Sequence, residues 1–118
     1  MIERAQHLIC ENISARLNLS GLARALSVSE RTLFRRFKLA TGMTPNEYLQ
    51  EVRIASAKSS LELTNDSIAT IAACAGYSDR AFFSQVFREH AGVTPSAYRA
   101  RARRLRPDAR RRSARMAV

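Results

Sequence analysis

The chain has 118 residues, enough for one ordinary domain, and 46% hydrophobic and 25% charged residues, a globular composition. No apolar run approaches the roughly 18 residues that a membrane-spanning helix needs, and no signal-peptide pattern follows Met1, so we expect a cytoplasmic protein without a membrane partner. The two cysteines, Cys10 and Cys74, lack metal-ligand spacing. We therefore expect buried thiols, with no disulfide and no metal site.

The net charge of +10 is unevenly distributed along the sequence. Residues 99–118 hold nine arginines against one aspartate, a net +8, whereas residues 1–98 hold eleven basic and nine acidic residues, a net +2. A basic segment attracts any polyanion or simply stays solvated, so net charge alone indicates no single function. We expect residues 105–118 to form a disordered, arginine-rich tail.

The strongest signal is an internal repeat. The residues Leu33, Phe37, Gly42, Thr44, Pro45 and Tyr48 recur 50 positions later as Phe83, Phe87, Gly92, Thr94, Pro95 and Tyr98. Upstream the offset is 49, because Leu22 and Ala23 match Ile71 and Ala72. One extra residue therefore lies in the second copy, around residues 76–78. Two copies indicate a duplicated supersecondary motif.

The first copy, at about residues 20–41, predicts a short helix, a turn and a second helix, which is the helix-turn-helix layout. Ser20 is expected to cap the first helix and Ser29 the second, which should end before Gly42.

A longer linker helix is predicted at about residues 45–63, because Thr44 can cap it and Pro45 suits its first position. At about 1.5 Å per residue it would span roughly 28 Å, which suits two recognition helices one DNA turn, about 34 Å, apart. Its apolar residues fall on two sides, as in a helix packed between two bodies. These sides carry Tyr48, Leu49, Val52, Ala55 and Leu63, and Ile54, Ala57 and Leu61.

The second copy, at about residues 67–91, repeats the layout. Ser67 is expected to cap its first helix and Gly76 to end it, and its second helix should run from about Arg80 to Ala91. The predicted fold class is therefore all-α, with two helix-turn-helix subdomains joined by a central linker helix within residues 1–104.

In the first copy we expect Leu33, Phe37 and Ala40 to face the core. The opposite face carries Arg31, Arg35 and Lys38, with Thr32 and Arg36 beside them. Guanidinium groups can bond guanine O6 and N7, and lysine can hold phosphate oxygens. A solvated helix face is the simpler alternative for any charged stripe, but the duplicated helix-turn-helix context favours DNA.

In the second copy we expect Phe83, Phe87 and His90 to face inward. The outward residues are then Arg80, Ala81, Ser84, Gln85 and Arg88. Gln85 could contact adenine, and fewer cations make the second helix the weaker of an uneven pair. Two further aromatic residues, Phe34 and Phe82, could pack in a core, pack between subdomains or contact bases, and we favour packing.

No catalytic pattern accompanies these helices. His7 and His90 have no metalloprotease spacing, and the sequence holds no phosphate-binding glycine loop or nucleophile motif. We therefore expect no enzyme activity and no cofactor.

The repeated residues resemble a known family. The first half of an AraC/XylS-family DNA-binding domain is similar to Leu22–Ala23, Arg31–Lys38, Thr41–Pro45, Tyr48–Leu49, Arg53, Ala57 and Leu61. Its second half resembles Ile71–Ala72, Gly76–Asp79, Phe83, Phe87, Gly92–Pro95 and Tyr98–Arg99. The resemblance covers about residues 5–104. It implies seven helices, with those at 30–41 and 80–91 entering successive major-groove segments of double-stranded DNA. It also implies bacterial transcription regulation at the nucleoid, commonly activation with RNA polymerase as a partner.

Two features depart from the family pattern. Gln85 stands where the second recognition helix often carries arginine, and the N-terminal effector or dimerisation domain of most members is missing. The residue pattern of the first copy is similar to that of family members whose N-terminal domain is of the amidotransferase or DJ-1/PfpI-like type. We thus expect a fragment of a longer regulator, with a stand-alone domain as the alternative. The alternative function is nonspecific nucleic-acid or partner binding by the arginine-rich tail.

Overall fold

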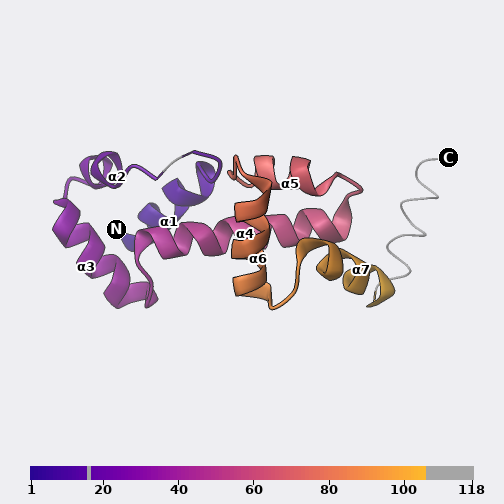
Figure 1. Ribbon diagram of the computed structural model, residues 1–118. Coiled ribbons are helices and arrows are strands. Elements are labelled where there is room, and N and C mark those ends of the chain that lie inside the picture. Colours follow the sequence, from indigo (N-terminus) through magenta and orange to yellow (C-terminus); the bar gives the residue numbers. More distant parts are fainter. Residues whose placement is uncertain (16, 106–118) are drawn as a thin grey trace. The chain divides into compact units, whose positions relative to one another are not determined.

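The computed structural model describes residues 1–15 and 17–105, and this part of the chain forms seven α-helices and no strand (Figure 1). Of the predicted tail, residues 105–118, Leu105 is the last residue of a helix, and the residues from 106 onward lie outside the described part of the chain. The helices are α1 (Ile2–Glu11), α2 (Leu19–Ala25), α3 (Glu30–Thr41), α4 (Pro45–Leu63), α5 (Ile68–Cys74), α6 (Arg80–Ala91) and α7 (Pro95–Leu105). No helix among them is long and apolar enough to cross a bilayer.

The chain divides into two compact units, of which the first is Met1–Arg53. In this unit both α1 and α2 pack against α3. Their shared core holds Ala5, Ile9, Leu22, Ala23, Leu33, Phe37 and Leu49. The ring of Phe37 meets the edge of Tyr48 at 5.4 Å between centroids, so the start of α4 is fixed to the middle of α3.

The second unit begins at Ile54 and repeats this packing, with α6 in contact with both α5 and α7. Its core is built around two fully buried phenylalanines, Phe83 and Phe87. Phe87 meets the edge of Tyr98 at 5.5 Å, the same contact that Phe37 makes with Tyr48 in the first unit. The 50-residue repeat in sequence is therefore also a repeat in packing.

Helix α4 contributes to the cores of both units, but not in the way its sequence pattern predicts. Leu49 belongs to the first core, whereas Ile54, Ala57 and Leu61 belong to the second. Successive stretches of the helix are thus buried, each within its own unit. Of the two predicted apolar sides, the one with Ile54, Ala57 and Leu61 is buried, whereas the one with Tyr48 and Leu49 is wrong at two positions. On that side Ala55 is exposed and Leu63 is 68% exposed.

Arginine side chains fix the ends of these elements. In the first unit, Arg53 donates from Nε to the carbonyl of Ile13 at 2.6 Å and from Nη2 to that of Ala15 at 2.8 Å. In the second, Arg99 donates to the carbonyls of Leu61 and Thr64, both at 3.3 Å. The carbonyls of Leu61 and Thr64 lie at the C-terminal end of α4. Carbonyls at this end of a helix have no hydrogen-bond partner within the helix and attract a positive charge.

Helix caps largely follow the sequence prediction. Ser29 accepts a hydrogen bond from the backbone of Thr32, and Ser67 accepts one from the backbone of Thr70, each at 3.1 Å. The predicted Ser20 cap is wrong. Asn18 caps α2 instead, accepting from the N–H of Gly21 at 3.0 Å. Asparagine caps as well as serine does, so residue type alone does not favour Ser20 over Asn18.

The extra residue of the second turn is confirmed. Ala23 accepts from the N–H of Val28 at 3.0 Å, and Ala72 accepts from that of Tyr77 at 2.9 Å, so the turns match at an offset of 49 through Tyr77. Between Tyr77 and the cap Asp79 stands Ser78, which has no counterpart between Val28 and the cap Ser29. Ser78 is therefore the inserted residue.

Four burial predictions are wrong. Ala40 and His90 lie on the inner faces of α3 and α6 but are exposed, because each stands in the last turn, where the core no longer covers the helix. Cys10 and Cys74 are also exposed, as free thiols. Cys10 lies 3.9 Å from the hydroxyl of Tyr48; burial, followed by this contact, raises the pKa of Tyr48.

Candidate nucleic-acid interface

All ten residues predicted to contact DNA lie on the second helix of a helix-turn-helix unit. Eight of them are exposed, and Thr32 and Ser84 are half-buried. Helix α3 carries Arg31, Thr32, Arg35, Arg36 and Lys38, and helix α6 carries Arg80, Ala81, Ser84, Gln85 and Arg88. Within each unit, the structure thus brings its five predicted residues onto one helix.

The exposed face of each helix follows from the residues that its core buries. Leu33 and Phe37 are fully buried one turn apart on α3, as Phe83 and Phe87 are on α6. Residues three and four apart share a helix face, so the residues between Leu33 and Phe37 lie away from the core and are exposed. On α6 Gln85 is likewise exposed, whereas Val86 is buried with the two phenylalanines. Glycine ends both helices in the left-handed conformation, with φ of 78° at Gly42 and 79° at Gly92.

A shallow depression lies on the outer side of each helix, at matched positions. On α3 it is lined by Phe34, Arg35, Lys38, Leu39 and Gly42. On α6 it is lined by Ser84, Gln85, Arg88, Glu89 and Thr94. The first four residues of each set are related by the 50-residue offset. The structure thus groups Arg35 with Lys38 and, separately, Gln85 with Arg88.

Two residues that line these depressions, Leu39 and Glu89, have no role in the sequence analysis. Leu39 is 80% exposed, although leucine is usually buried. Glu89 lies beside Gln85, whose Nε2 donates to Glu89 Oε1 at 3.5 Å. A search for cations alone passes over both, although the 50-residue offset relates Leu39 to Glu89.

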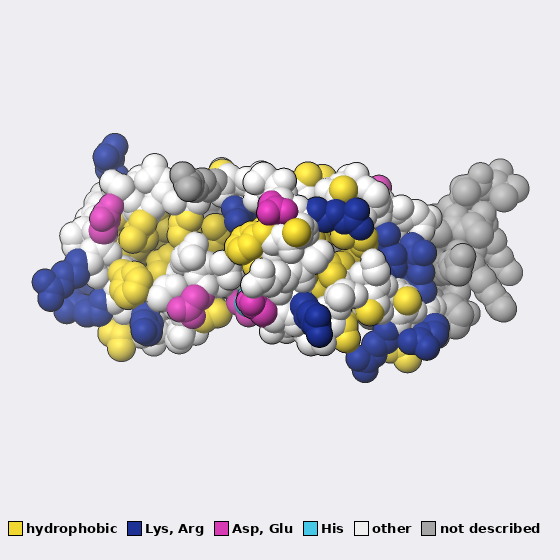
Figure 2. Space-filling model, in the orientation of Figure 1, with side chains coloured by type: hydrophobic (Ala, Val, Ile, Leu, Met, Phe, Trp, Pro, Cys, Tyr) yellow, Lys and Arg dark blue, Asp and Glu magenta, His cyan; other side chains and the backbone are white. Residues whose placement is uncertain are grey.

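Electrostatically, the two depressions differ. The outer face of α3 holds Arg35 and Lys38. Neither of these two cations has an acidic partner among residues 17–105. On α6 one cation, Arg88, lines the depression together with an acid, Glu89. Figure 2 shows basic side chains gathered over α3 beside hydrophobic ones. The face of α3 is therefore the more attractive to an anion.

The match to known sequences spans both units. The sequence pattern of the helix-turn-helix domain family fits residues 22–101, from within α2 to within α7. The chain belongs to the AraC-type helix-turn-helix family. This confirms the resemblance at the level of the family, and with it the all-α fold class.

Curated relatives of this AraC-type domain are longer than the chain. The transcriptional activator RhaS of Pectobacterium atrosepticum is 42% identical over 91 residues, which cover 77% of this chain and 33% of RhaS. The chain thus spans about a third of the length of this relative. The bifunctional transcriptional activator and DNA repair enzyme AdaA of Bacillus subtilis is 36% identical over 91 residues, 43% of its length.

Solved AraC-type structures match nearly the whole described chain. The DNA-binding domain of the global transcriptional factor AdpA, solved in complex with a target DNA, superposes with a TM-score of 0.83 at 29% identity, covering 91% of this chain and 96% of that domain. A regulator with an AraC-type domain from Chromobacterium violaceum gives 0.81 at 34% identity, covering 86% and 90%. The family is thus one of DNA-binding transcription regulators.

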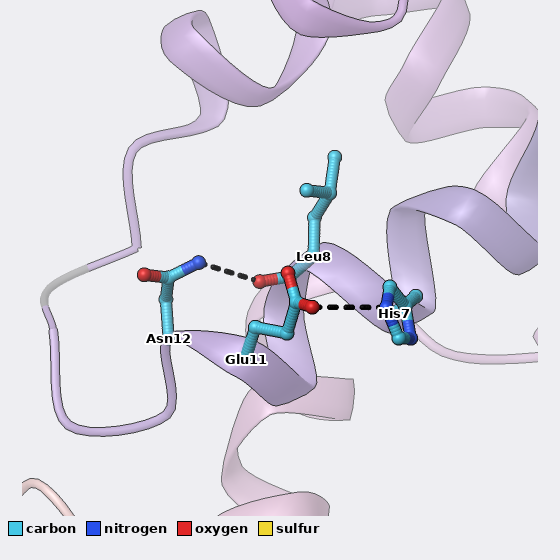
Figure 3. Close-up of polar contacts among 4 residues, drawn as sticks. All are labelled: His7, Leu8, Glu11 and Asn12. Carbon is cyan, nitrogen blue, oxygen red and sulfur yellow. Dashed lines mark hydrogen bonds and ion pairs between the residues drawn. The ribbon is translucent and has the colours of Figure 1, made fainter.

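His7, one of the two histidines considered for catalysis, lies on the surface of α1. Its Nε2 is 2.9 Å from Glu11 Oε1, one helical turn away (Figure 3). Its side chain is 72% exposed. An exposed pair of this kind is typical of a solvated helix surface.

Proposed function

We propose that this domain binds double-stranded DNA at specific sequences and thereby regulates transcription, with α3 and α6 as its two recognition helices. The observation that carries the proposal is the matched pair of depressions on these helices, in which Arg35 and Lys38 on α3 stand at the positions equivalent to Gln85 and Arg88 on α6. Helices exposed on this side can enter a major groove. In this proposal the two helices enter successive groove segments of one DNA duplex.

Each residue then has a role set by its chemistry. Arg35 contacts guanine at O6 and N7, and Gln85 contacts adenine at N6 and N7. Lys38 and Arg88, one turn further along their helices, hold phosphates. The remaining predicted residues contact the DNA backbone or a thymine methyl group. They are Arg31, Thr32, Arg36, Arg80, Ala81 and Ser84. The first helix supplies most of the affinity, because the acid Glu89 lies on the second.

We further propose an activator that works in the bacterial cytoplasm, at the nucleoid, and touches RNA polymerase. The names of its relatives, such as the activator RhaS, support this assignment. In the same proposal the domain belongs to a longer regulator with an N-terminal effector or dimerisation domain of the amidotransferase or DJ-1/PfpI-like type. The match covers 33% of RhaS, a proportion that agrees with one domain of a longer regulator.

Selection from a random duplex pool at near-physiological salt tests the proposal, with the full chain and residues 1–105 in parallel. We expect both to enrich a motif of two boxes about 10 base pairs apart. If only the full chain binds, and binds all duplexes equally, its affinity comes from phosphate contacts of the basic C-terminal segment. That result would replace sequence-specific binding with the nonspecific alternative.

A further inference from the structure

An exposed phenylalanine lies within the basic face of α3. Phe34 is 42% exposed and belongs to neither core, so the core alternative considered for it is wrong. It lines the same depression as Arg35 and Lys38, together with the 80%-exposed Leu39. Exposed apolar side chains between two cations suit a partner that has an apolar group within an anionic surface.

The other exposed phenylalanine has a different environment. Phe82 on α6 is 49% exposed, but its ring lies 6.0 Å from that of Tyr77, which is buried. Phe82 thus covers the turn between α5 and α6. Among the described residues Phe34 has no such ring neighbour. The exposed side chain of Phe34 therefore has no packing role that is visible in the first unit.

The DNA major groove offers one apolar group at its edge, the C5-methyl of thymine, and phenylalanine is among the side chains that contact it. The methyl lies in a groove lined by phosphates, which Arg35 and Lys38 can approach. We infer that Phe34 reads a thymine methyl in the DNA segment bound by α3. This inference rests on the proposed function and adds to it an apolar contact that selects thymine.

The second helix lacks this contact. The residue equivalent to Phe34 is Ser84, and the one equivalent to Leu39 is Glu89, so the depression of α6 is polar where that of α3 is apolar. A methyl contact would thus be confined to one of the two boxes. Its loss would be seen at one thymine or a pair of adjacent ones, and not across the site.

Replacing thymine by deoxyuridine removes the methyl and leaves base pairing unchanged, which gives a direct test. In a duplex selected by the full chain, each thymine is replaced in turn, and binding is measured by titration. We expect about fourfold weaker binding at one position, the equivalent of one buried methylene. Phe34→Ala should weaken binding to the thymine duplex by a similar factor and be insensitive to the methyl.

Two further variants keep the result interpretable. Phe34→Leu retains an apolar side chain and should keep most of the methyl dependence. Leu63→Ala removes an exposed leucine from α4 and should bind like the unaltered chain. Thermal denaturation of all three variants tests whether they remain folded.

Several outcomes would overturn the inference. One is a chain that binds its selected duplex equally with and without each methyl, or a selected site without thymine. Another is a Phe34→Ala variant that retains the full methyl dependence. If Phe34→Ala binds DNA normally but loses contact with RNA polymerase, the residue serves a protein partner. If no duplex is selected at all, the proposed function itself fails, a result distinct from DNA binding without methyl dependence.

Discussion

Exchanging Arg35 and Gln85 tests whether the two recognition helices read bases through equivalent positions. These residues are related by the 50-residue offset and line matched depressions. Arg35→Gln gives α3 the adenine-reading group of α6, and Gln85→Arg gives α6 the guanine-reading group of α3. Because Arg35 has no acidic partner among the described residues, its replacement breaks no ion pair within this part of the chain.

The magnitude follows from the chemistry of a two-point contact. A bidentate pair between arginine and guanine discriminates by about 1–3 kcal/mol, which corresponds to roughly a five- to 150-fold loss on the original duplex. Most of this loss should be recovered when adenine replaces the guanine at that position. For Gln85→Arg we expect stronger binding on all duplexes, since a cation joins Arg88, and a preference for guanine in the second box.

Titrations on a panel of duplexes with each base at each position measure both effects, at two salt concentrations. The reasoning requires that Arg35→Gln alters the base preference at one position. If the variant instead loses affinity equally on every duplex, and the salt slope falls by about one, Arg35 contacts phosphate. An unchanged affinity and slope would remove Arg35 from the interface.

Three further predictions concern phosphate contacts and stability. Lys38→Ala and Arg88→Ala should each weaken binding on all duplexes and lower the salt slope by about one; an unchanged slope would exclude that residue from the interface. Phe83→Ala should cost about 3–5 kcal/mol of unfolding free energy, measured by denaturant titration, since Phe83 is fully buried; an unaltered midpoint would contradict the assigned core. Gly42→Ala and Gly92→Ala should each cost about 1 kcal/mol from backbone strain alone, because both glycines have positive φ and an added Cβ meets nothing within 4 Å. A marked difference in unfolding free energy between Gly42→Ala and Gly92→Ala would show that one of these positions makes a contact that the equivalent position in the other copy lacks.

The sequence predicts the fold class well because the repeat supplies two independent copies of each signal. Either copy alone would offer a short apolar helix and a glycine, and the second copy shows that Leu33 and Phe83 occupy the same buried position. The offset change from 49 to 50 predicts an extra turn residue, and the hydrogen bonds of the turn assign it to Ser78.

Several of the predictions that failed concern helix ends. Helix periodicity assigns Ala40 and His90 to the inner face, but periodicity does not reveal where the covering helices stop. Likewise, both Asn18 and Ser20 are acceptable caps by residue type, and only the backbone of Gly21 decides between them. The exposure of Phe34 could not be predicted for the same reason, because it depends on which part of the surface of α3 the other helices cover.

The contrast between the two copies makes a prediction about the DNA itself. What the copies share is what the fold needs: the buried phenylalanines, the aromatic pairs with Tyr48 and Tyr98, and the glycine ends of α3 and α6. What they do not share is the outward surface, where arginine is replaced by glutamine and leucine by glutamate. Two helices with different outward chemistry cannot favour the same bases, so one bound chain should select two dissimilar boxes in a fixed order. A palindrome with identical half-sites would instead require the same helix of two chains, and such a motif from the selection experiment would show that the two helices of one chain do not read the site together.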